Sequence, residues 1–414
     1  YLLNYITIVL FNVEFLRNRD WEQRKLREHA KYRRGSFPQP YGNKEWYDGA
    51  GSKPFVQVVD VGDNLRLVDN TKQKISLLAQ SKSVFVPAGK VVVTLQGSIG
   101  RVAITQYDSF VDRTLLIFDE YQLQTNEYFW AYTIQQKFEI EKKKAPGGTI
   151  KTITKEALSE FEVFLPKYEE QQKIGSFFKI IDTTIALHQR QSDTYKELKK
   201  SMLQKMFPQD GEKVPEIRFD GFTEEWERRS LNSIVKRVTR KNKNLESSLP
   251  LTISAQHGLV DQNTFFNKQV ASKDVSGYYL VKKGEFAYNK SYSSGYPWGA
   301  IKRLDNYDMG VLSTLYIVFQ PVNIVSDFLV TYYDTNLWHK EVSMRAAEGA
   351  RNHGLLNISA QDFFETELII STNTEEQARI GCYFKQLDDT IALHKQKTTC
   401  LQILKNSLLN KMFI

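Results

Sequence analysis

Residues 169–208 read EEQQKIGSFFKIIDTTIALHQRQSDTYKELKKSMLQKMFP, and residues 375–414 read EEQARIGCYFKQLDDTIALHKQKTTCLQILKNSLLNKMFI. About half of the positions are identical, and the two copies lie about 205 residues apart, which is typical of an internal repeat. The chain of 414 residues is therefore expected to consist of two similar halves, each ending in one copy of this stretch.

Residues that suit a buried seam recur every seven positions in both copies. Such spacing, with no proline inside it and no glycine cluster, predicts two long amphipathic helices that pair as a coiled coil. Each helix would be about 57 Å long at a rise of 1.5 Å per residue. Thr374 to Gln377 (TEEQ) has the pattern of a capping box, which predicts the start of the second helix.

The two helices are expected to pack against each other in antiparallel orientation, because the first leads the chain out of one half and the second must return to it. The predicted interface comprises Ile174, Ile181, His188, Tyr195 and Met202 from the first helix, and Ile380, Leu387, His394, Leu401 and Leu408 from the second. This pairing sets Ile174 opposite Leu408 and brings His188 and His394 together near the centre. The histidines are interpreted as a polar pair that fixes the register; a metal site or a pH switch is the alternative.

Composition and cysteine placement argue against a secreted, disulfide-linked protein and against a membrane-spanning one. Hydrophobic residues make up 41% of the chain, which is ordinary for a globular protein, and the net charge of +8 favours a polyanionic partner. The two cysteines, Cys382 and Cys400, lie too far apart on one predicted helix to form a disulfide, so a cytoplasmic location is expected. Residues 1–15 are apolar but too short to span a bilayer, and they lack the features of a signal peptide.

Short apolar runs separated by Gly and Pro predict several strands in each half, followed by a helix and then by the long helix. Residues 21–34 show helical spacing around Trp21 and Leu26, and residues 327–344 are expected to form one helix. The predicted fold class is α+β: two similar α/β recognition domains joined by two long antiparallel helices, with a pseudo-twofold internal repeat. The expected divisions are an atypical lead-in at 1–20, a first domain at 21–167, a first long helix at 168–208, a second domain at 209–372 and a second long helix at 373–414.

No catalytic motif is found in the sequence: it has no nucleotide-binding glycine loop and no clustered Cys and His with metal-ligand spacing. What recurs is basic and amide side chains interleaved with aromatic ones, which can hold phosphates and read base edges. The DNA-binding candidates of the first half are Arg33, Arg34, Tyr41, Lys44, Gln96, Ser98, Arg101, Thr149 and Lys151. Those of the second half are Asn289, Lys290, Tyr292, Ser294, Tyr296, Trp298, Lys302, Arg345, Arg351, Asn352 and His353. For any one of them, an ordinary surface role is the competing interpretation.

The chain resembles the specificity subunit of type I restriction–modification systems over nearly everything after Trp21. The duplicated EEQQKIG and EEQARIG helix starts and their KMF ends carry the resemblance most strongly. Further support comes from residues 93–104 (VTLQGSIGRVAI), 148–166 (GTIKTITKEALSEFEVFLP) and 286–303 (FAYNKSYSSGYPWGAIKR). The resemblance implies two target-recognition domains, each reading half of an asymmetric bipartite DNA sequence, with the two long helices setting the distance between the halves.

The resemblance also implies the partners. The subunit is not itself an enzyme; it carries two modification (methyltransferase) subunits, which restriction subunits join. S-adenosylmethionine, ATP and Mg would belong to those partners, and this chain would hold no cofactor and no metal. The alternatives are a free-standing sequence-specific DNA-binding regulator, which would purify without a methyltransferase, and an enzyme, which would cleave or methylate DNA by itself.

Overall fold

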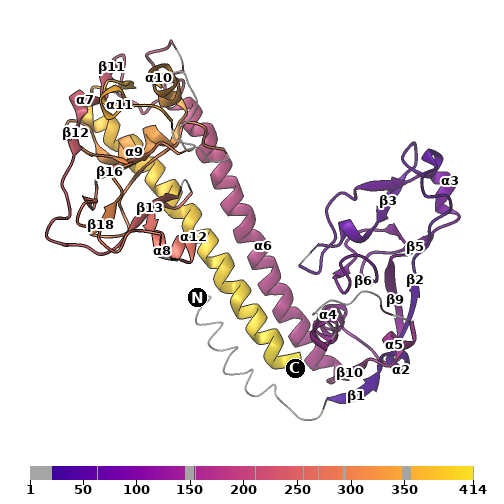
Figure 1. Ribbon diagram of the computed structural model, residues 1–414. Helices are drawn as coiled ribbons and strands as arrows, with labels where there is room; N and C mark the ends of the chain where they lie inside the picture. The colour runs from indigo at the N-terminus through magenta and orange to yellow at the C-terminus, as the bar shows by residue number, and fades with distance from the viewer. Residues whose placement is uncertain are drawn as a thin grey trace. The chain divides into compact units, whose positions relative to one another are not determined.

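The protein is described here from a computed structural model, which defines residues 21–62, 64–144, 153, 155–209, 211–254, 256–268, 270–291, 295–346 and 356–413. The chain divides into two compact units (Figure 1). Unit 1 consists of Tyr1–Gln189 with Lys395–Ile414, and unit 2 of Arg190–His394. Each unit therefore contains part of both long helices. The predicted lead-in at residues 1–20 lies outside the described residues.

Unit 1 is built on two four-stranded sheets, with strand orders β2-β9-β6-β7 and β4-β3-β8-β5, and on the two-stranded pair β1-β10. Its elements are β1 Glu22–Lys25, α2 Leu26–His29, β2 Ala30–Arg34, η1 Lys44–Trp46, β3 Lys53–Val56, η2 Val58–Asp60, β4 Gln73–Ile75, α3 Leu77–Gln80, β5 Val84–Val86, β6 Val91–Thr94, β7 Val102–Ile104, β8 Ser109–Val111, β9 Leu115–Tyr121, α4 Glu127–Lys144, α5 Lys155–Ser159, β10 Glu162–Leu165 and the first part of α6 Tyr168–Lys205.

Unit 2 has one four-stranded sheet, with the order β12-β19-β16-β17, and three strand pairs, β11-β20, β13-β14 and β15-β18. Its elements, after the end of α6, are β11 Glu227–Ser230, α7 Leu231–Ile234, β12 Val235–Val238, β13 Leu251–Ser254, β14 Gly258–Asp261, α8 Gln262–Phe266, β15 Tyr279–Lys282, β16 Phe286–Asn289, β17 Ala300–Arg303, β18 Met309–Leu312, β19 Ile317–Pro321, α9 Ser326–Asp334, α10 Leu337–Arg345, α11 Ala360–Phe364, β20 Glu367–Ile370 and the first part of α12 Thr374–Phe413.

The two units share one frame. The sheet β2-β9-β6-β7 corresponds strand for strand to β12-β19-β16-β17, and the pair β1-β10 corresponds to β11-β20. The pair β5-β8 also has a counterpart in β15-β18, but the remaining elements differ: unit 1 adds β3 and β4 to that pair in one sheet, whereas unit 2 has the separate pair β13-β14 followed by α8. The predicted α+β class, with two similar sheet-containing units and two long helices, is confirmed.

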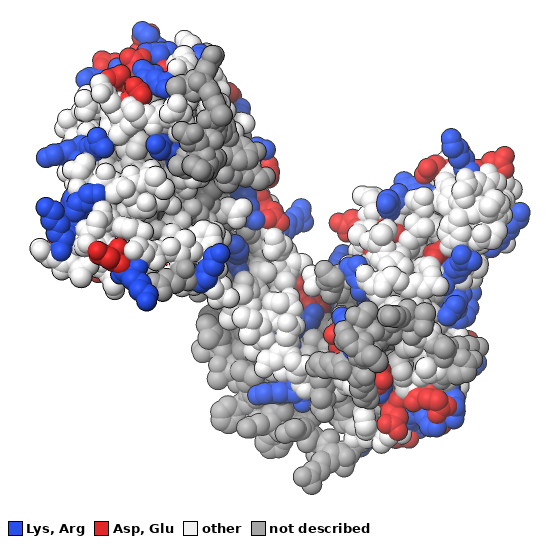
Figure 2. Space-filling model, viewed as in Figure 1, with Lys and Arg blue, Asp and Glu red and all other residues white. Residues whose placement is uncertain are grey.

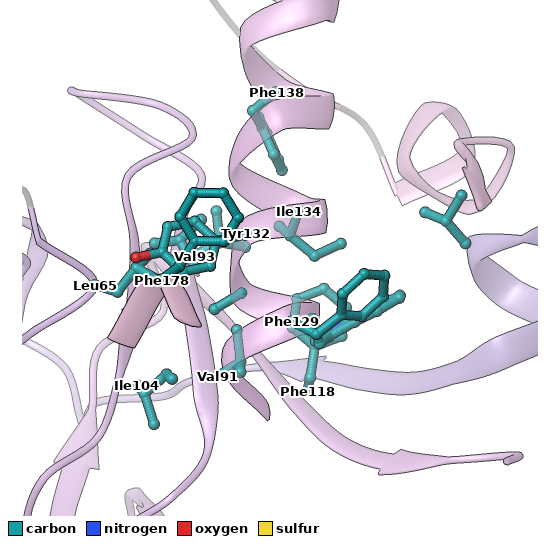
Figure 3. Packing of buried hydrophobic residues seen from close by; sticks show 14 of the residues in the cluster. Leu65, Val91, Val93, Ile104, Phe118, Phe129, Tyr132, Ile134, Phe138 and Phe178 are labelled. Carbon is teal, nitrogen blue, oxygen red and sulfur yellow. The ribbon is translucent and has the colours of Figure 1, made fainter. Parts of the chain in front are cut away.

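The core of unit 1 lies where α4 crosses its sheet and the start of α6. Phe129, Ile134 and Phe138 follow one another along α4 beside Val91 and Val93 of the sheet (Figure 3). Tyr132 packs on Phe178 of α6, with ring centroids 4.9 Å apart. Because burying one such side chain contributes roughly 1.5–3 kcal/mol, this cluster binds helix and sheet into one body.

The repeated start of each long helix has the same structural task in both units. In unit 1, the side-chain oxygen of Gln171 accepts a hydrogen bond from the backbone N–H of Asn126 (3.1 Å), next to the start of α4. In unit 2, that of Gln377 accepts from the N–H of Val325 (2.9 Å), next to the start of α9. Both glutamines also donate to a carbonyl just before their own helix, at 2.9 and 2.7 Å.

The glycine four residues later allows the close approach that these hydrogen bonds require. A Cβ added at Gly175 would meet Asn126 Oδ1 at 2.2 Å, and one added at Gly381 would meet the backbone nitrogen of Phe328 at 2.7 Å. Contacts this short are not compatible with packed atoms. The QxxxG spacing shared by both copies, Gln171 to Gly175 and Gln377 to Gly381, therefore docks the crossing helix of its unit.

Within each unit, α6 and α12 run antiparallel, as can be followed in Figure 1. In unit 1, Ile174 and Ile181 share a buried cluster with Leu401 and Leu408 of α12. In unit 2, Ile380 and Leu387 of α12 share a buried cluster. The same cluster receives the partly buried Tyr195 and Met202 of α6. His394 stacks on Tyr195 with ring centroids 5.8 Å apart, and His188 is partly buried.

Charged pairs cross the helix seam at equivalent positions of the repeat. In unit 1, Lys405 Nζ lies 2.6 Å from Asp182 Oδ1, and both side chains are less than 10% exposed. In unit 2, the equivalent residues exchange roles: Lys199 Nζ lies 2.8 Å from Asp388 Oδ2. The hydroxyl of Tyr132 donates to Asp182. One oxygen of the Asp182 carboxylate therefore faces Lys405 and the other accepts from Tyr132, both within unit 1.

Three local predictions from the sequence are wrong. Residues 21–34 form β1, a one-turn helix α2 and β2 rather than one helix, because β1 pairs with β10 and β2 with β9. Residues 327–344 form two helices, α9 and α10, with Thr335 in extended conformation between them. The second long helix is capped by Asn373, whose Oδ1 accepts from the N–H groups of Glu375 and Glu376 (2.9 and 3.3 Å), and not by a box on Thr374.

Candidate nucleic-acid interface

The tight turn between β6 and β7 brings together the first group of predicted DNA-binding residues. Gln96 and Ser98 are exposed there, and Arg101 is partly buried at the start of β7. Gly97 and Gly100 have φ of 67° and 84°, which other residues adopt only with strain. A Cβ on Gly100 would also come within 2.8 Å of the Phe138 ring, so the turn lies directly against α4.

A polar cavity of about 430 Å³ lies between this turn and α4. Ser98 and Arg101 line it from the turn, and Gln135, Glu139 and Lys142 line it from the helix. Amide, guanidinium and ammonium groups in one recess provide both donors and acceptors for base edges and phosphates. Gln135 and Glu139 were not singled out by the sequence, although they lie seven and three residues before Lys142, which places all three on one helix face.

Arg33 and Arg34 lie on β2 and line a second cavity, of about 300 Å³, together with Tyr32 and Leu95. Arg33 is bound to Asp119 of the neighbouring strand, with Nε 2.8 Å from the carboxylate. Arg34 is exposed. Of this predicted pair, Arg33 therefore has a local acidic partner on β9.

Tyr41 and Lys44 lie in the segment after β2. The hydroxyl of Tyr41 donates to Asp112, and Arg113 lies over its ring at 5.0 Å. Burial, together with the Asp112 carboxylate, raises the pKa of Tyr41. Tyr41 thus acts as a neutral donor within unit 1, while Lys44 is exposed on η1.

In unit 2, Asn289 and Lys290 end strand β16. The Asn289 side chain accepts a hydrogen bond from the N–H of Ser291 (3.0 Å). Lys290 Nζ donates to the carbonyl of Ile358 (3.1 Å), and burial lowers the pKa of Lys290. Tyr296 and Trp298 are partly buried, and the carbonyl of Trp298 accepts a hydrogen bond from Tyr288 (2.9 Å). These contacts fix the described residues on either side of residues 292–294, between β16 and β17.

Lys302 and Arg345 have acidic partners inside unit 2. Lys302 Nζ lies 2.8 Å from Asp334 Oδ1, and the other oxygen of Asp334 lies 2.9 Å from Lys199. Burial alone would raise the pKa of Asp334, but the two lysines outweigh it, and the pKa is lowered. Arg345 lies 2.5 Å from Glu341 on the same helix. Both predicted contacts are thus part of structural ion pairs.

Seven predicted residues lie outside the described part of the chain and remain predictions: Thr149, Lys151, Tyr292, Ser294, Arg351, Asn352 and His353. The carboxylate of Asp60 has a structural role in unit 1. Asp60 is buried, and its carboxylate accepts from the N–H groups of Gln57 and Lys72, both at 2.8 Å.

Within the described residues, no group of three or more His, Cys, Asp or Glu side chains is arranged to hold a metal ion. None of the helices in the described ranges has the length and apolar character needed to cross a membrane.

The frame occurs twice with different inserts, and in unit 1 a polar cavity lies at the β6–β7 turn. These features agree with one known family. Residues 18–197 match the family described as the type I restriction modification DNA specificity domain. Residues 18–197 therefore form a domain of the type I restriction–modification DNA specificity family. The match ends within α6 and covers the described part of unit 1 except its C-terminal segment Lys395–Ile414, and the frame of unit 2 repeats that of unit 1 strand for strand.

Solved structures show similarity in fold. The S subunit of the type I restriction–modification system from M. genitalium has a TM-score of 0.63 and 16% identity, covering 96% of this specificity protein and 98% of that chain. A chain from a study of complex assembly and conformational transition of the type I R-M system gives 0.49 and 14%, covering 96% and 98%. The HsdS subunit from Thermoanaerobacter tengcongensis gives 0.43 and 14%, covering 95% and 97%. The first likeness shows that the two-unit fold is shared.

Proposed function

We propose that each unit of this specificity protein reads one half of an asymmetric, bipartite DNA target. The observation that carries the proposal is the repeated frame with unlike inserts. The frame keeps the sheet and the long helix in place, whereas β3, β4 and α3 of unit 1 have β13, β14 and α8 in their place in unit 2. Two different sets of side chains on one frame are suited to two different base sequences, because base readout depends on the placement of individual donors and acceptors.

In unit 1, the cavity lined by Ser98, Arg101 and Gln135 is the proposed place of base contact. Its guanidinium and amide groups have the donor and acceptor geometry for guanine and adenine edges. In unit 2, the segment after β16 that carries Asn289 and Trp298 is the proposed equivalent, because it occupies the same place in the frame as the β6–β7 turn.

The two long helices are proposed to set the number of unread base pairs between the half-sites. Helices α6 and α12 have 38 and 40 residues. At 1.5 Å per residue each is about 57–60 Å long, which corresponds to about 17 base pairs at 3.4 Å per step. The outer faces of the helix pair are proposed to dock two modification subunits, which carry out the methylation.

The chain itself is proposed to be non-catalytic and to act where the DNA is, in the cytoplasm. S-adenosylmethionine would be bound by the modification subunits, and ATP and Mg by the restriction subunits that join them. The family assignment supports these roles, since a specificity domain supplies the choice of sequence.

The test is to express the chain with its modification subunits and to map methylated adenines in the DNA of the cell by single-molecule sequencing. The expected result is one bipartite motif with two unlike halves and a fixed unread spacer. Methylation spread over all sequences, or a motif with a single uninterrupted core, would contradict the proposal.

A further inference from the structure

Strand β12 of unit 2 presents basic side chains that are not neutralised locally. It is the outer strand of the sheet β12-β19-β16-β17. Lys236 and Arg237 are exposed on it, opposite Gln320 and Phe319 of β19. Lys243, in the turn that follows, is exposed as well. None of the three forms an ion pair with a carboxylate of the described residues.

The turn that carries Lys243 has a defined conformation. Asn242 is fully buried, its side-chain nitrogen donates to the carbonyl of Ser247 (2.8 Å), and its side-chain oxygen accepts from the N–H of the same serine (3.2 Å). The backbone that carries Lys243 is thus held in place before any ligand arrives, which lowers the backbone entropy lost on binding. Figure 2 shows Lys and Arg side chains along the margin of unit 2 where Figure 1 labels β12.

The equivalent strand of unit 1 is a matched contrast. Lys31 of β2 corresponds to Lys236 in the repeat, and it is bound to Glu120 of β9 at 2.8 Å. The side-chain hydrogen bond to Glu120, and then its charge, raise the pKa of Lys31. Arg33 on the same strand is bound to Asp119. Lys31 and Arg33 of the outer strand of unit 1 are therefore paired with acids, whereas Lys236 and Arg237 of unit 2 have no acidic partner among the described residues.

An outer strand with free basic side chains fits the DNA backbone, because phosphates accept from Lys and Arg and from the unpaired N–H groups of a sheet edge. The strand lies at the edge opposite β17, three strand spacings or about 14 Å away. We propose that Lys236, Arg237 and Lys243 bind phosphates of duplex DNA beyond the bases that unit 2 reads. This inference rests on the proposed function and adds a sequence-independent contact to it.

The test uses the full chain assembled with its modification subunits and a fluorescent 40-base-pair duplex of scrambled sequence, titrated at several KCl concentrations. For the double variant Lys236→Gln/Arg237→Gln, the slope of log K against log salt should become shallower by about 1.8, since each phosphate contact contributes about 0.9. Affinity at 0.1 M salt should fall on the order of tenfold. Lys243→Gln alone should reduce the slope by about 0.9.

Lys31→Gln is the control, because it removes the same charge from the same place in the repeat. It should leave the slope within about 0.3 of the wild type, since its partner acid already offsets that charge. The proposal is overturned if Lys31→Gln changes the slope as much as Lys236→Gln/Arg237→Gln does. It is also overturned if Lys236→Gln/Arg237→Gln keeps the slope but loses the modification subunits or self-associates, which would indicate a protein contact or protection of the strand edge. If Lys236→Gln/Arg237→Gln leaves the slope unchanged while the wild type methylates a bipartite motif, this inference alone is refuted. If the wild type methylates no defined motif, the proposed function is refuted.

Discussion

Unit 1 and unit 2 use the same frame but distribute charge differently within it. In unit 1, Lys31 and Arg33 of the outer strand pair with acids on β9, and the charged pair across the helix seam, Asp182 with Lys405, is almost fully buried. In unit 2, Lys236 and Arg237 of the outer strand have no acidic partner among the described residues, and the equivalent seam pair, Lys199 with Asp388, is extended by Asp334 and is more exposed. The two units thus share the glutamine and glycine that dock the crossing helix, but they differ in how the basic side chains on the outer strand and at the helix seam are paired.

The largest expected effect comes from breaking the buried pair of unit 1. Lys405→Met leaves the Asp182 carboxylate buried without its counter-charge, which should lower the free energy of unfolding of unit 1 by about 3 kcal/mol. Lys199→Met should cost about 1 kcal/mol, because Asp388 is half exposed and can be solvated. Urea unfolding combined with hydrogen exchange of peptides from each unit measures both values. Recovery of most of the loss in Lys405→Met/Asp182→Leu would support the buried-charge explanation, and equal losses for the two single variants would contradict the comparison.

A second contrast concerns the glycines that dock the crossing helices. Gly381→Ala should lower the free energy of unfolding of unit 2 by about 1–2 kcal/mol, because overpacking against the backbone exceeds the roughly 1 kcal/mol gained in helix propensity. Gly175→Ala should cost less, since the nearest atom to its new Cβ is in the Asn126 side chain, which can rotate. Thermal unfolding of both variants, with the exposed Ala392→Gly as a propensity reference, provides the measurement. A stabilised Gly381→Ala would show that the close approach is not required.

The smallest expected effect is on acid stability. The folded-state pKa of Asp334 is lowered from 3.8 by Lys302 and Lys199. Its contribution to stability is therefore fully present above about pH 4 and is lost as the pH falls through the lowered value. In Asp334→Asn, the free energy of unfolding of unit 2 should fall less on acidification than in the wild type, by a difference smaller than about 1 kcal/mol. In unit 1 the equivalent position of α4 is the uncharged Gln135, so Gln135→Asn should leave the acid limb unchanged; identical acid limbs for wild type and Asp334→Asn would refute this assignment.

The long helices could be predicted from the sequence because a seven-residue stripe is a local signal that repeats many times. The start of unit 1 could not, because β1 is stabilised by β10, more than a hundred positions away in the chain. The same limit applies to the interface. Arg33 and Lys302 have the right chemistry for DNA, but their acidic partners, Asp119 and Asp334, are distant in the sequence and come close only after folding. Gln135 was missed because a single amide on a helix carries no pattern of its own.

The central claim is that one duplicated frame presents two independent recognition units. It is tested most directly by replacing residues 33–165 with the corresponding stretch of another family member and mapping methylated adenines in cells that express the hybrid with its modification subunits. The account predicts a motif in which one half is new, while the other half and the unread spacer are unchanged. A motif changed in both halves would contradict it.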